Sequence, residues 1–206
     1  MQEIVANRGI GEYLEALAGD QAAPGGGSAA GIVGALAAAT GQMMASLTRE
    51  PSEAVLEASS KLAELRQRAL ECARNDETSY GGYIEALALP KESLEEKGAR
   101  KQAMNEAMEK SARVPLALAV VAVEIVDTLE AVILDGNRTV LGDADASIVL
   151  AQATVDICQI NVNANLKFIK DETLADDLRT SIEAAHEMIV HLASERRAQI
   201  ADRLAG

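Results

Sequence analysis

Aromatic side chains are scarce in this sequence of 206 residues. It has no Trp, one Phe and three Tyr, which make up 2% of the chain, whereas 49% of the residues are apolar. A core so poor in rings has to be built from Ala, Leu, Val and Ile, and strands usually hold more aromatic residues than this. The composition therefore favours closely packed helices over a sheet.

Positive charge is also in short supply. The chain has 19 Lys and Arg against 32 Asp and Glu, which gives a formal net charge of −13. A nucleic-acid site needs clustered Lys and Arg, and so does binding to an anionic membrane surface. We therefore expect neither nucleic acid nor a membrane among its partners. A small anionic ligand would need a local basic patch.

The residues that usually bind zinc are few. Cys72 and Cys158 both fall within helical patterns, where we expect small buried apolar side chains in a reducing compartment, although a disulfide stays open. With two His and no Cys/His cluster at ligand spacing, no metal site is expected. The first twenty residues have no basic segment followed by an apolar run, so the sequence predicts a cytoplasmic protein without a secretory signal.

Helical periodicity runs through most of the chain, and strand-like alternation is rare. The pattern predicts helices over residues 10–17, 28–48, 52–82, 89–135, 144–170 and 171–204. Pro115 either kinks the fourth helix or divides it in two. Since no linker interrupts the pattern, we expect one domain over residues 1–206, an all-α, up-and-down-type bundle of six or seven helices.

Residues 21–48 contain no charged side chain. The stretch is long enough to span a membrane, but few of its residues are strongly apolar. Its small residues recur at spacings of three and four, on one stripe of a helix: Gly27, Gly31, Gly34, Ala38, Gly41 and Ala45. Glycine costs about 1 kcal/mol in a helix interior, and close approach of another helix offsets that cost. We interpret the stretch as a Gly/Ala-rich central helix; a membrane span is the alternative.

A glycine-rich turn, Gly25-Gly26-Gly27-Ser28, precedes this helix. Backbone N–H groups at such a helix start can bind an anion. The turn is not a P-loop, because no Gly-Lys-Ser/Thr follows, and no strand precedes it as in a dinucleotide-binding motif. Alternatively, it is only a tight turn in which Ser28 caps the helix.

Asp76 interrupts the apolar stripe of the third helix. Every stripe residue before it, from Val55 to Cys72, is small or aliphatic, so a carboxylate stands where a core side chain belongs. Burial would raise its pKa and suit it to proton transfer near neutral pH. Two alternatives remain: a structural Asp paired with Arg or an amide, or a half-exposed Asp near a helix end at Gly81 and Gly82.

Polar residues at two further places are candidates for binding. Asn161 and Asn165 lie four residues apart on one helical face, so their amides could read the edge of a heterocycle or simply tie helices together. Lys167 and Lys170 add positive charge nearby, although lysines usually form a solvated face. The loop "LDGNRTVLGDADAS" contributes Asn137, Arg138 and Asp143, where helix capping by Asp143 explains much of the pattern.

Four stretches carry a resemblance to a known family: "APGGGSAAGIVGALAAATGQMMASLT", "NDETSYGGYIEALALP", "GNRTVLGDADAS" and "QINVNANLK". They resemble the cyclodeaminase domain of formiminotransferase-cyclodeaminase and its stand-alone bacterial relatives, the methenyltetrahydrofolate cyclohydrolases. Two positions depart from the family pattern. Arg74 stands where the family usually has the first of two Asp residues, and Gly142 replaces a Ser before Asp143.

The resemblance implies a homodimeric helical protein that acts on one-carbon units carried by tetrahydrofolate, with no cofactor beyond that substrate and no metal. Asp76 would be the general acid/base, and Asn161 and Asn165 would orient the pterin. The turn Gly25, Gly26, Gly27 and Ser28 would hold the substrate, with Asn137 and Asp143 as further binding residues. Lys167 and Arg138 would meet the carboxylates of the glutamate tail. The alternative is a non-catalytic folate-binding or scaffolding subunit that kept the fold.

Overall fold

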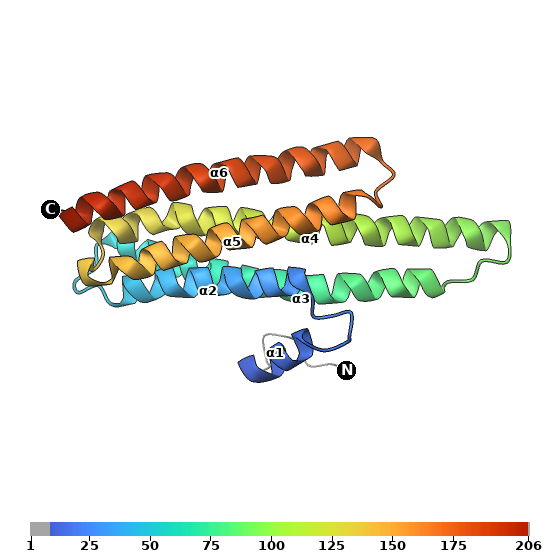
Figure 1. Ribbon diagram of the computed structural model, residues 1–206, viewed down its shortest axis with the longest axis horizontal. Helices are drawn as coiled ribbons and strands as arrows, with labels where there is room; N and C mark the ends of the chain where they lie inside the picture. Colours follow the sequence, from blue (N-terminus) through green and yellow to red (C-terminus); the bar gives the residue numbers. More distant parts are fainter. Residues whose placement is uncertain (1–8, 206) are drawn as a thin grey trace.

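A computed structural model describes residues 9–205 and contains no strand within that range. Its elements are α1 (Ile10–Leu17), α2 (Gly26–Ser46), α3 (Glu53–Ala88), α4 (Leu94–Asp135), the short 3-10 helix η2 (Arg138–Val140), α5 (Leu141–Leu166) and α6 (Glu172–Ala205). The five long helices lie lengthwise beside one another, and α1 lies outside them (Figure 1). The prediction of an all-α helical bundle is confirmed.

Side-chain caps fix where two of the long helices begin. Ser52 precedes α3 and its Oγ accepts from the backbone N–H of Val55 at 3.4 Å. Ser93 precedes α4 in a reciprocal arrangement: its Oγ accepts from Glu96 N, and Glu96 Oε2 accepts from Ser93 N. Such a capping box satisfies two helix-start N–H groups at once. Helix α4 then continues through Pro115 as one element and ends at Gly136, so it is not divided.

The charge-free helix α2 packs against α3, α4 and α5. A Cβ added to Gly31 would lie 2.7 Å from Cβ of Ala73 in α3, and one added to Gly41 would lie 2.6 Å from Cδ2 of Leu129 in α4. Helix α2 is long and apolar enough, by length and composition, to cross a membrane. Close packing against its neighbours accounts for the same composition, as predicted for a central helix.

In α1, Ile10 and Leu14 are 77% and 55% exposed, and Tyr13 is the buried residue. Two interpretations of helix caps are wrong. Ser28 does not cap α2, because Gly25 is the N-cap and the Ser28 side chain bonds elsewhere. Asp143 does not cap α5 either. The 3-10 turn brings the start of α5 forward to Leu141, which leaves Asp143 in its first turn.

Both cysteines are free thiols. Cys158 is fully buried and Cys72 partly so. Burial raises the pKa of Cys72 to about 11 and raises that of Cys158 as well, which keeps both protonated at neutral pH. They behave as small apolar side chains, as expected.

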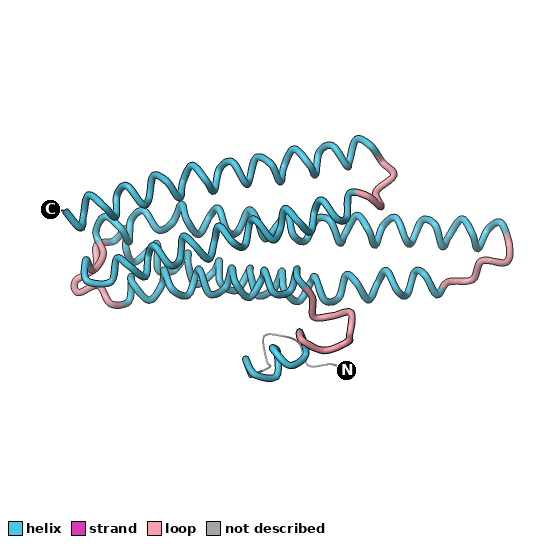
Figure 2. The backbone as a smooth tube through the Cα atoms, in the orientation of Figure 1, coloured by secondary structure: helices cyan, strands magenta, loops and turns pink. Residues whose placement is uncertain are grey.

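The end of α3, the start of α4 and the loop between them project past the other long helices (Figure 2). We call this projection the α3–α4 arm and define it as residues 77–108. It begins where α2 starts and where α5 ends. The arm therefore adds a wall beyond the bundle, on the side where the candidate site lies.

Candidate active site

Asp76 lies on α3 beside the first turn of α2. A Cβ added to Gly27 would lie 2.1 Å from Oδ1 of Asp76 and 2.4 Å from its Cγ. Real Cβ atoms do not approach so closely, so only glycine at position 27 leaves room for the carboxylate where it stands. The glycine turn thus accommodates the carboxylate of Asp76, a group of the protein itself, whereas the sequence predicted that the turn binds an anionic ligand.

Burial raises the pKa of the Asp76 carboxyl, and the neighbouring charge of Glu77 raises it further. The backbone N–H of Ser28, at the positive end of α2, opposes this by stabilising the charged form. Burial dominates, so the predicted upward shift is confirmed. A carboxyl group held this way can exchange a proton closer to neutral pH than an exposed one.

The Ser28 side chain joins two residues that the sequence analysis missed. Its Oγ donates to Oε1 of Glu77 at 2.9 Å, and Oη of Tyr13 lies 3.2 Å from the same Oγ. These contacts fix the first turn of α2 against both α1 and α3. No local signal identifies them, because residues 13, 28 and 77 are far apart along the chain.

A cavity of about 330 Å³ opens beside Asp76. Its walls come from the start of α2, from α3 and α4, and from the end of α5. They are formed by Ala22, Ala23, Gly26, Gly27, Asp76, Tyr83, Met108, Ser111, Asn161, Asn165 and Phe168. Five of the predicted site residues meet here. The volume lies within the range of small-molecule sites. We call it the Asp76 cavity.

In each of the two asparagines of this cavity, the amide nitrogen has a partner in the protein and the amide oxygen has none among the described residues. Nδ2 of Asn161 donates to the carbonyl of Ile157 at 3.0 Å, and Nδ2 of Asn165 donates across to the carbonyl of Ser111 in α4 at 3.1 Å. The alternative that they tie helices together is therefore correct for Asn165. Within residues 9–205, no hydrogen bond engages either Oδ1, so each amide keeps an acceptor for a ligand.

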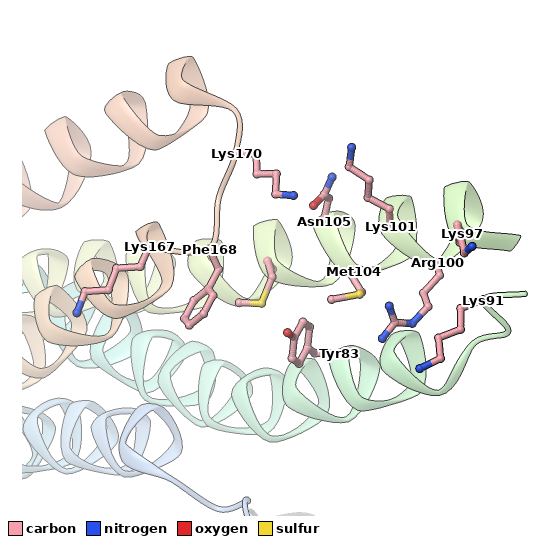
Figure 3. Close-up of a pocket in the computed structure, with 11 residues that line it drawn as sticks. Tyr83, Lys91, Lys97, Arg100, Lys101, Met104, Asn105, Lys167, Phe168 and Lys170 are labelled. Atoms are coloured by element: carbon pink, nitrogen blue, oxygen red, sulfur yellow. The ribbon is translucent and has the colours of Figure 1, made fainter. Parts of the chain in front are cut away.

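A second cavity, of about 470 Å³, adjoins the first (Figure 3). It lies between the α3–α4 arm and the loop that follows α5. Six cationic side chains line it: Lys91, Lys97, Arg100, Lys101, Lys167 and Lys170. The chain has only 19 Lys and Arg residues, and six of them line this one cavity. This basic cavity is therefore the local positive patch that an anionic ligand requires. Lys167 belongs to it rather than to the Asp76 cavity.

Asn137, Arg138 and Asp143 lie at the opposite end of the bundle. Nδ2 of Asn137 donates to the carbonyl of Leu47, just past the end of α2, at 3.0 Å, and Arg138 donates to the carbonyl of Leu204 at 2.8 Å. Helix α2 has 21 residues and is therefore about 30 Å long. The structure does not bring these three residues to Asp76 within one chain. Gly25 and Ser28 border the Asp76 cavity without lining it.

Several known proteins are similar to this chain. A methenyltetrahydrofolate cyclohydrolase of Methylorubrum extorquens is 32% identical over 87% of this chain and 89% of its own. Formimidoyltransferase-cyclodeaminases of Gallus gallus and Sus scrofa are 29% and 26% identical. The chain spans only 31% and 38% of the length of these two relatives, so it corresponds to one part of them.

The fold has a solved counterpart in the formiminotetrahydrofolate cyclodeaminase of Thermotoga maritima. The two superpose with a TM-score of 0.84 over 97% of this chain and 99% of the other, at 23% identity. This similarity concerns the arrangement of helices. Residues 9–184 match the formiminotransferase-cyclodeaminase family, which is most of the chain. The chain belongs to the formiminotransferase-cyclodeaminase family.

Proposed function

We propose that this chain is an enzyme of folate one-carbon metabolism that works at the carbon between N5 and N10 of tetrahydrofolate. It would act as a methenyltetrahydrofolate cyclohydrolase or as a formiminotetrahydrofolate cyclodeaminase. The observation that carries the proposal is the Asp76 carboxylate, set against Gly27 with a raised pKa, in a cavity that also holds two amides. The named relatives support the same chemistry.

In the hydrolytic direction, water adds to the methenyl carbon of a cationic amidinium. Asp76 takes the proton of the attacking water, which leaves a tetrahedral carbon that carries a hydroxyl group. Asp76 then returns that proton to N5 as the carbon–N5 bond breaks. The hydroxyl group releases its own proton to solvent and becomes the carbonyl of the formyl group on N10. The negative charges of Asp76 and Glu77 also favour binding of the cationic substrate.

In the deaminating direction, N10 attacks the carbon of the protonated formimino group on N5. Asp76 takes the proton that N10 loses and gives it to the departing nitrogen, so ammonia leaves and the ring closes. Both directions pass through a tetrahedral carbon between two nitrogens. One residue that first accepts and then donates a proton serves either reaction.

Binding falls to the residues around Asp76. The acceptor oxygens of Asn161 and Asn165 suit the N–H groups on the edge of a pterin, while Gly26 allows a flat ring to approach the backbone. The basic cavity suits the carboxylates of the glutamate tail, with Lys167 among its six cations. Arg138 has no part in this arrangement, because it lies at the other end of the bundle.

The test uses purified protein with methenyltetrahydrofolate and formiminotetrahydrofolate in parallel. Loss of the methenyl chromophore reports the cyclohydrolase reaction, and its appearance reports the cyclodeaminase reaction. We expect acceleration of at least one of them over the rate in buffer. Folate binding in calorimetry without either reaction would instead indicate the non-catalytic binding subunit.

The same proposal includes a homodimer. Helix α2 and its C-cap turn an apolar stripe outward, where Leu36, Met43 and Leu47 are 48%, 42% and 48% exposed. Such a stripe, free of charge, suits contact with a second copy. Light scattering should give twice the chain mass of 21.6 kDa. A mass of one chain at micromolar concentration would contradict the dimer.

A further inference from the structure

Two of the four aromatic residues of the chain, Tyr83 and Phe168, lie where the two cavities meet. Together with Met108, they line both the Asp76 cavity and the basic cavity. Tyr83 comes from α3 and Phe168 from the loop after α5, and in Figure 3 both rings project into the space between these elements. In a chain with 2% aromatic residues, this coincidence needs a physical reason.

Core packing does not provide that reason for Phe168. Its side chain, from the only Phe in the sequence, is 59% exposed, so it gains little from burial within the folded chain. An exposed ring at the wall of a cavity is available to a ligand. Tyr83 on the other side and the thioether of Met108 complete a surface suited to a flat aromatic group.

We propose that Tyr83 and Phe168 bind the p-aminobenzoyl ring of the folate substrate, so that the substrate lies lengthwise through both cavities. This inference rests on the proposed function. The three parts of the ligand then meet three different surfaces in order. The reacting carbon lies at Asp76, the benzoyl ring at the Tyr83–Phe168 junction, and the glutamate carboxylates among the lysines.

Charge sets the direction of the bound substrate. With the ligand reversed, the glutamate carboxylates would lie against Asp76, with the charge of Glu77 nearby, and the cationic methenyl group would lie among six cations. Both placements bring like charges together, which costs free energy. Only one orientation pairs opposite charges at both ends, and it leaves the aryl ring at the junction in the middle.

Fragments of the substrate test the aryl site without catalysis. Calorimetry would compare p-aminobenzoylglutamate with glutamate alone on the full chain and on the variants Phe168→Leu and Tyr83→Leu, which remove a ring. Phe168→Tyr and Tyr83→Phe keep a ring at each place. Val190→Ala changes another exposed apolar residue, on α6, away from both cavities. Circular dichroism checks that each variant is folded.

We expect the wild type to bind p-aminobenzoylglutamate more tightly than glutamate. Each Leu variant should lose roughly five- to tenfold in affinity for that fragment, while the ring-keeping variants and Val190→Ala change by less than about twofold. In turnover, the Leu variants should raise KM more than they lower kcat. Equal binding of the two fragments, or unchanged affinity in both Leu variants, would overturn the aryl site.

The outcome is separable from that of the proposed function. A wild-type enzyme that turns over folate with no dependence on the two rings would refute this inference and leave the proposed function intact. A protein without turnover that still binds the fragment through Tyr83 and Phe168 would refute the catalytic proposal and support the aryl site. A protein that does neither would refute both.

Discussion

Glycine and asparagine residues lie near both ends of helix α2, but the polar groups at the two ends differ in what they do. At its start, Gly27 holds the carboxylate of Asp76 beside a cavity, and the asparagine amides there keep unused acceptors. At its end, both polar atoms of the Asn137 side chain form hydrogen bonds within the protein: Nδ2 donates to the carbonyl of Leu47, and Oδ1 accepts from Thr139. Residue type alone does not distinguish a side chain that can bind a ligand from one that only stabilises the fold. The distinction lies in whether the side chain still has a hydrogen-bonding atom without a partner in the protein.

Hollows occur at both ends, so shape does not decide between them either. The far hollow, of about 430 Å³, is lined by Thr48, Arg49, Asp135, Gly136, Asn137 and Thr139. Its groups are largely joined to each other and to neighbouring loops, as when Ser52 Oγ donates to Asp135 at 3.0 Å. The near end adds a carboxyl group with a raised pKa and an adjoining basic cavity. Substitutions at each end should therefore have different consequences.

The largest effect is expected for Asp76→Asn. The amide keeps the size of the side chain but cannot accept a proton from water, so kcat should fall by about 10²- to 10⁴-fold. Stopped-flow absorbance of the methenyl chromophore measures the rate. Asp202→Asn, at an exposed position of α6, makes the same chemical change away from both cavities and should leave kcat unchanged. Near-normal turnover by Asp76→Asn would remove Asp76 from the mechanism.

The next effect comes from Gly27→Ala. The new methyl group would overlap the Asp76 carboxylate, which has to rotate away from its position, so kcat should fall by roughly 10²-fold. Gly142→Ala is a matched control, because Gly142 is also the second residue of its helix and has open space around it. That variant should retain activity and gain up to about 1 kcal/mol of stability. Equal rates in the two alanine variants would show that the contact with Asp76 is dispensable.

At the far end, Asn137→Ala should lower stability and spare catalysis. The variant loses the hydrogen bonds to Leu47 and Thr139, so the free energy of unfolding should fall by about 1 to 2 kcal/mol. Urea denaturation measures the change, and kcat/KM of the folded variant should match the wild type. A loss of kcat as large as that of Asp76→Asn would instead place the loop in an active site, as happens if a partner subunit brings it to Asp76.

Sequence periodicity predicted those features that depend on a single helix, namely which of its residues are buried or packed against a neighbour. The stripe on the third helix predicted the raised pKa of Asp76, and the spacing of small residues predicted the close helix contacts of Gly31 and Gly41. Periodicity could not predict which helices and loops contact one another. The basic cavity combines residues near 91–101 with residues near 167–170, and the Tyr13–Ser28–Glu77 contacts join three helices. Periodicity tells which face of a helix is buried, but not which helix ends meet.

The smallest effect concerns stability and pH. Because the pKa of Asp76 is raised above its ordinary value of 3.8, the folded chain binds this proton more tightly than the unfolded chain. Below pH 3.8 both states carry the proton; as pH rises through the folded pKa, that stabilisation is lost. Asp76→Asn has no such dependence, so its stability relative to the wild type should increase with pH. Urea unfolding between pH 3.5 and 8 measures both proteins, and a constant difference would contradict the burial of an ionisable carboxyl group at the start of α2. The Asp76→Asn variant thus reports two quantities separately: the loss of stability caused by burying the carboxylate, from urea unfolding, and its contribution to catalysis, from kcat.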